Sequence, residues 1–135
     1  MLIARLARLP AGRRLLLAEA AAELAVARAA TAAPMSFARM TRWSARRLGR
    51  RSRTDVAELV WAVRAVATRV PFRAVCLQQA VALQRMLRRR GHDARLHYGL
   101  RTGGRLEAHA WVTLRGEVLI GGEEAVRFRE VAAWP

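Results

Sequence analysis

The hydrophobic period of this chain changes once, at Gly91, and that change constrains the fold more than any other feature. Before Gly91, apolar residues recur every three or four positions, which is typical of one buried face of an α-helix. From Ala94 to Leu100, apolar and polar residues alternate, which is typical of a half-buried β-strand. Helices followed by antiparallel strands predict an α+β fold.

Residues that cap and end helices divide the first part of the chain. Thr54 is the expected N-cap of one helix, and Pro71 ends that helix because the residue before a proline is pushed toward extended geometry. Gly91 is expected to end the next helix, because glycine readily adopts the left-handed conformation that commonly follows a helix C-terminus. We expect helices over residues 13–30, 35–48, 54–70 and 76–90. The first two are rich in arginine, so we divide the chain into a basic helical region, 1–52, and a core, 53–135.

Turn-forming residues separate the strands that follow. Gly103–Gly104 turns the chain after the first strand, and Arg115–Gly116 is a tight hairpin signal. We expect strands over residues 94–100, 105–114 and 117–120, and a short final strand near Val126 and Phe128. The sequence therefore predicts a small antiparallel sheet after the helices.

All 25 basic residues are arginine, and with 10 acidic residues they give a net charge of +15. Such a chain either binds nucleic acid or another anionic surface, or keeps its arginines on solvated helix faces. The sequence contains no recognisable DNA- or RNA-binding motif, and aromatic residues make up only 6% of it, which is few for base stacking. An arginine-rich nucleic-acid-binding domain is therefore kept as an alternative only.

Composition also limits the chemistry and the location of the protein. One cysteine excludes an internal disulfide framework, and three separated histidines with two aspartates argue against a metal centre. We expect neither a metal nor a cofactor. The most apolar stretch, Leu15 to Ala33, contains two glutamates and an arginine, so it is too polar to span a membrane or to act as a secretory signal. We expect a cytoplasmic protein without a membrane span.

Cys76 and His109 are the candidate catalytic residues. Cys76 is expected at the N-terminus of a helix, where unpaired N–H groups and the helix dipole favour a thiolate and can hold an oxyanion. His109 lies in the middle of a predicted strand between two alanines, which leave room around its ring. A thiol and an imidazole placed in this way form a nucleophile and its base. The alternative is that Cys76 is a small buried apolar residue and His109 a structural one.

The sequences around these two residues resemble the leader peptidases of lasso-peptide biosynthesis, which are bacterial transglutaminase-like cysteine proteases. The resemblance covers about residues 72–130 and rests on Val75–Leu77, Ala82–Gly91 and Glu107–Val112. It implies a transglutaminase-like or papain-like core, in which the helix that carries Cys76 packs on a small antiparallel sheet. It also implies that Cys76 is the nucleophile and His109 the general base in removal of the leader from a ribosomally synthesised precursor.

The resemblance further implies partners that the residues themselves do not reveal. In systems of this kind a separate small leader-binding protein presents the precursor peptide to a short peptidase. A cyclase of the asparagine-synthetase type then closes the lasso ring. We therefore expect the precursor, the leader-binding protein and the cyclase as partners.

The third catalytic residue is where the sequence departs from this family. Transglutaminase-like sites usually have an aspartate on the strand after the histidine, but a hairpin loop of two or four residues places Gly122 opposite His109, and a loop of three residues places Gly121 there. We predict that Glu123 reaches back to orient the ring. A backbone carbonyl, a partner or an incomplete triad are the alternatives. An incomplete triad would make the protein a catalytically inactive scaffold homologue.

Overall fold

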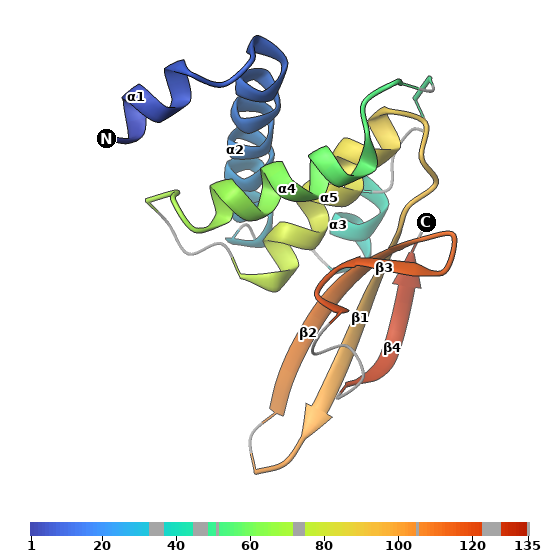
Figure 1. The fold of residues 1–135 in the computed structure, drawn as a ribbon. Coiled ribbons are helices and arrows are strands. Elements are labelled where there is room, and N and C mark those ends of the chain that lie inside the picture. The colour runs from blue at the N-terminus through green and yellow to red at the C-terminus, as the bar shows by residue number, and fades with distance from the viewer. Residues whose placement is uncertain are drawn as a thin grey trace.

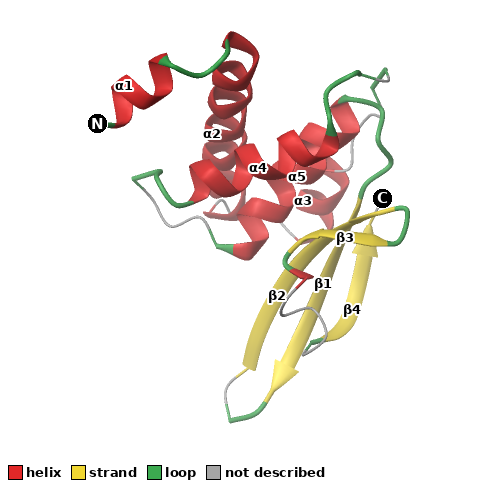
Figure 2. Ribbon diagram, in the orientation of Figure 1, coloured by secondary structure: helices red, strands yellow, loops and turns green. Residues whose placement is uncertain are grey.

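Helices precede an antiparallel sheet in the computed structural model, which confirms the predicted α+β fold (Figure 1). The structure describes residues 1–32, 37–44, 49–50, 52–71, 75–104, 106–122 and 128–134. The helices are α1 (Leu2–Ala7), α2 (Ala11–Ala32), α3 (Phe37–Ser44), α4 (Val56–Ala67) and α5 (Cys76–Arg89). The strands are β1 (Arg95–Thr102), β2 (Leu106–Leu114), β3 (Glu117–Ile120) and β4 (Arg129–Trp134), in the spatial order β3-β2-β1-β4 (Figure 2).

Most elements lie where the sequence predicted them, with three differences. The short helix α1 was not predicted. The N-cap of α4 is Asp55 and not Thr54, because the Asp55 carboxylate accepts a hydrogen bond from the Ala57 N–H at 3.1 Å. The last strand begins at Arg129, after Phe128, and pairs with β1 at the far edge of the sheet. Val126 lies outside the described residues, and the division of the chain at residue 52 stays a prediction.

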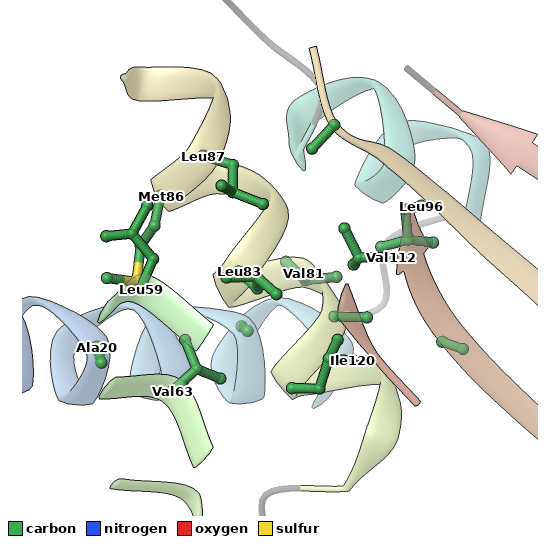
Figure 3. Packing of buried hydrophobic residues seen from close by; sticks show 14 of the residues in the cluster. Ala20, Leu59, Val63, Val81, Leu83, Met86, Leu87, Leu96, Val112 and Ile120 are labelled. Carbon is green, nitrogen blue, oxygen red and sulfur yellow. The ribbon is translucent and has the colours of Figure 1, made fainter. Parts of the chain in front are cut away.

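The hydrophobic core lies between the helices and one face of the sheet (Figure 3). It contains Leu83 of α5, Val63 of α4, and Val112 of β2, all fully buried. Side chains alternate along a strand, so Ala110 and Val112 point toward α5, whereas Trp111 points to the opposite face. This alternation decides which residues of β2 can approach α5.

Ion pairs fix the C-terminal half of α5 against α2. Glu23 is buried and pairs with Arg85 at 2.6 Å and also with Arg89. Glu19 pairs with Arg90 at 2.6 Å and with Arg89 at 2.5 Å. Burial acts to raise the pKa of Glu19, but its hydrogen bonds to these arginines and their charges outweigh burial and hold that pKa below its ordinary value. These arginines therefore belong to the fold and are not simply solvated.

We predict that Glu23→Gln destabilises the protein by about 2–3 kcal/mol, because it leaves two guanidinium groups without their buried carboxylate. The measurement is the urea midpoint of unfolding. The matched control is Glu58→Gln, which removes an ion pair to the exposed Arg13 and should leave the midpoint almost unchanged. Equal shifts in both variants would contradict this account of the α2–α5 contact.

Candidate active site

The first turn of α5 is held in place by Gln78, which is buried. The Gln78 Nε2 donates a hydrogen bond to the Thr31 hydroxyl of α2 at 2.9 Å, and its Oε1 accepts one from the Val75 N–H at 3.0 Å. Cys76 lies between these contacts, at the first position of the helix, and is half-buried. Gln78 satisfies only the N–H of the N-cap residue Val75, and Val75 has no side chain that could accept a hydrogen bond from the first turn. Among the described residues, the N–H groups at the start of α5 are therefore available to an oxyanion.

His109 lies on β2, and its ring is buried on the sheet face opposite the core. It stacks on Trp111, with ring centroids 6.1 Å apart, and contacts Phe128, with ring centroids 5.1 Å apart. Trp111 stacks in turn on His97, at 5.4 Å. The imidazole is therefore held in a row of rings and has little freedom to rotate.

The carbonyl oxygen of Gly121 is a hydrogen-bond partner of the His109 ring. It lies 2.8 Å from the Nε2 of His109. A carbonyl can only accept a hydrogen bond, so Nε2 carries the proton and the Nδ1 of the neutral ring is unprotonated. A backbone carbonyl, one of the alternatives open from the sequence, thus orients His109. Glu123 lies outside the described residues, so its predicted role stays a prediction.

A β-bulge brings Gly121 to this position. Thr113 pairs with Val118, but the next pair is Val112 with Ile120, so one extra residue is inserted in β3. The described pairing of β3 with β2 ends at Ile120, so this ladder contains no pair of His109 with Gly121 or Gly122. The expectation that Gly121 or Gly122 pairs directly opposite His109 was therefore wrong, because loop length alone does not reveal a bulge.

Only glycine fits at position 121. Its φ of +78° is left-handed, and an added Cβ would lie 2.8 Å from the Ala110 carbonyl oxygen and 3.1 Å from the His109 Nε2. The absence of a side chain, which looked like a missing catalytic group in the sequence, is therefore what allows the backbone to approach the imidazole.

Cys76 and His109 line the same cavity, of about 530 Å³. Ala108 and Ala110 of β2 also line the cavity, as does Ile120, where the described part of β3 ends. Cys76 reaches it from the α5 face of the sheet, and His109 from the opposite face. Within the described residues no hydrogen bond joins the thiol to the imidazole, but a group bound in the cavity would be next to both a nucleophile and a base.

Tyr98 is a neighbour of Cys76 that the sequence analysis did not single out. It pairs with Ala110 across the sheet and points toward α5. Burial raises the pKa of Tyr98, and the charge of the Cys76 thiolate raises it further. This influence of Cys76 on the Tyr98 pKa identifies Tyr98 as a polar neighbour of the thiol. The alternating pattern of β1 could have indicated this position, because Tyr98 follows Leu96 by two residues and so shares its strand face.

Two charged residues complete the cavity wall. Arg64 of α4 lines it, and so does Glu107, which pairs with Arg101.

In the described part of the chain no three metal-binding side chains form a cluster that could hold an ion. In the same part, each helix is too short or too polar to cross a membrane.

Comparison with known proteins identifies a family. A family model described as the transglutaminase-like superfamily matches residues 7–133, nearly the whole chain. No curated protein matches the sequence, and no solved structure matches the fold.

We predict that Gly121→Ala displaces the His109 ring, because the new methyl group would contact Nε2 and the Ala110 carbonyl. The matched control is Gly116→Ala, which has a similar φ of +81° but open space around it. Both variants should lose about 1–2 kcal/mol of stability from the left-handed backbone, and Gly121→Ala should lose more because of its contact with the Ala110 carbonyl. Only Gly121→Ala should change the tautomer signals of His109 in ¹⁵N–¹H NMR spectra. Identical imidazole spectra for wild type and Gly121→Ala would contradict the assigned contact.

Proposed function

This chain belongs to the transglutaminase-like superfamily, and we propose that it is a cysteine peptidase that removes the leader from a lasso-peptide precursor. The observation that carries the peptidase proposal is one cavity lined by a cysteine at a helix N-terminus and a histidine whose Nε2 is hydrogen-bonded. The choice of a lasso-peptide precursor is supported by the resemblance of residues 72–130 to leader peptidases.

In the first half of the reaction, Cys76 Sγ attacks the scissile carbonyl carbon while its proton passes to His109 Nδ1. The negative oxygen that forms is held by N–H groups of the first turn of α5. The C–N bond then breaks, and His109 gives its proton to the leaving amine. The products of this half are the released amine fragment and a thioester on Cys76.

In the second half, water attacks the thioester, and His109 Nδ1 takes a proton from it. The C–S bond breaks, the carboxylic acid leaves, and the proton returns to the thiolate of Cys76. The neutral Gly121 carbonyl orients the ring but stabilises its protonated form less than a carboxylate does. We therefore expect slower turnover than in relatives that carry the aspartate.

The proposed setting is the bacterial cytoplasm, where ribosomally synthesised precursors are made. The proposed partners are the precursor peptide, a small leader-binding protein that presents it, and an asparagine-synthetase-like cyclase. The cavity that contains Cys76 supports this proposal, because its volume of about 530 Å³ is large enough to receive a few residues of a peptide presented by another protein.

We predict that Cys76→Ala abolishes release of the leader and that His109→Ala slows it by about 10²–10⁴-fold, the usual contribution of a general base. The wild type and variants are incubated with the precursor and the leader-binding protein, and the fragments are identified by mass spectrometry. His92→Ala is the control, because His92 lies outside the cavity and should retain activity.

Two outcomes would overturn the proposal. Cleavage by Cys76→Ala at the wild-type rate would exclude a thiol mechanism. Normal assembly with the partners but no cleavage by the wild type would identify the protein as the inactive scaffold instead.

A further inference from the structure

A second cavity, of about 650 Å³, lies among α1, α2 and α4, and we call it the α1–α4 groove. Its apolar lining includes Leu6 of α1, Leu17 of α2 and Trp61 of α4. It shares no lining residue with the cavity that contains Cys76. The groove is thus a separate feature that the proposed reaction does not use.

Helix α1 forms one wall of the groove and is itself poorly covered. None of its residues is buried, and Leu2, which lines the groove, is 52% exposed. A helix of six residues is marginal on its own, and most helical stability in proteins comes from packing of an apolar face. A ligand that fills the groove would supply the packing that α1 lacks.

Charge indicates the chemistry of that ligand. Three arginines line the groove, Arg5, Arg14 and Arg69, and no carboxylate does. Within the described residues none of the three forms an ion pair. A second copy of this chain, with its net charge of +15, would bring arginines against arginines. A flat bilayer would meet the rim but not the half-buried Trp61 inside. An acidic polypeptide fits both the rim and the interior.

We propose that the α1–α4 groove binds an acidic amphipathic helix of a partner protein. Its apolar residues, spaced i, i+3, i+4 and i+7, would lie on Leu6, Leu17 and Trp61, and its carboxylates would face Arg5 and Arg14. This docking site is independent of the peptidase chemistry, and it would hold a partner while the Cys76 cavity stays open.

The probe is a fluorescein-labelled synthetic peptide in which leucines follow this spacing and glutamates fill the other positions. Its comparison is a scrambled peptide of the same composition, which has no apolar face. We expect the full-length protein to bind the amphipathic peptide at least about tenfold more tightly, measured by fluorescence anisotropy. Equal binding of the two peptides would overturn the proposal, because charge alone would then explain it.

Matched variants locate the binding site. Arg5→Glu, Arg14→Glu and Arg69→Glu together lower the net charge from +15 to +9, and the same change at Arg28, Arg53 and Arg95, which lie outside the groove, is the control. We expect the first set to weaken binding about tenfold or more beyond the second. Equal weakening would contradict a specific site.

Single uncharged substitutions test the apolar part with little risk to folding. Leu2 lines the groove and Ile3 does not, although both are exposed residues of α1. Leu2→Ser should weaken peptide binding, and Ile3→Ser should not.

Three further readouts distinguish other occupants. The bound peptide should leave the rate of Cys76 alkylation by iodoacetamide unchanged, and protection of Cys76 would mean that it binds as a substrate. Binding to phosphatidylglycerol vesicles that Leu2→Ser and the groove charge reversal abolish would assign the groove to a membrane. Self-association lost in the same variants, measured by sedimentation, would assign it to a second copy. Each of these results would overturn the partner-helix proposal.

Discussion

The hydrogen bond from His109 Nε2 to the Gly121 carbonyl, 2.8 Å long, is the contact on which the rest of the site depends. It fixes the tautomer of the ring, because the carbonyl can only accept, and so leaves Nδ1 as the basic nitrogen. The bulge in β3 and the left-handed glycine bring the carbonyl to this position. A backbone carbonyl can orient the ring, but it stabilises the protonated imidazole less than a carboxylate would.

The nucleophile depends on a different set of contacts, which make α5 a fixed support. Gln78 ties its first turn to α2, and Glu19 and Glu23 of α2 hold its last turns through ion pairs. Its central residues pack against α4 and against the inner face of the sheet (Figure 3). Cys76 therefore has a defined place relative to β2, although 33 residues of sequence separate it from His109.

Regular periodicity made much of this predictable. The position of α5 and the extents of β2 and β3 follow from apolar spacing and turn residues, and these elements place Cys76 and His109. The bulge in β3 did not follow, because no residue type signals an extra residue at Leu119. Nor could composition show that Arg85, Arg89 and Arg90 pair with acids of α2, because an arginine in an ion pair and one in water look alike in a sequence. What the sequence lacked was information about contacts between distant segments.

The central claim is that the Cys76 thiol and the His109 imidazole work on the same group in one cavity. The most direct test is the rate at which iodoacetamide alkylates Cys76 at neutral pH, in the wild type and in His109→Ala. If His109 withdraws the thiol proton, removal of its imidazole should slow alkylation by about tenfold or more. Equal rates in the two proteins would mean that the histidine does not activate the cysteine, and would contradict the account.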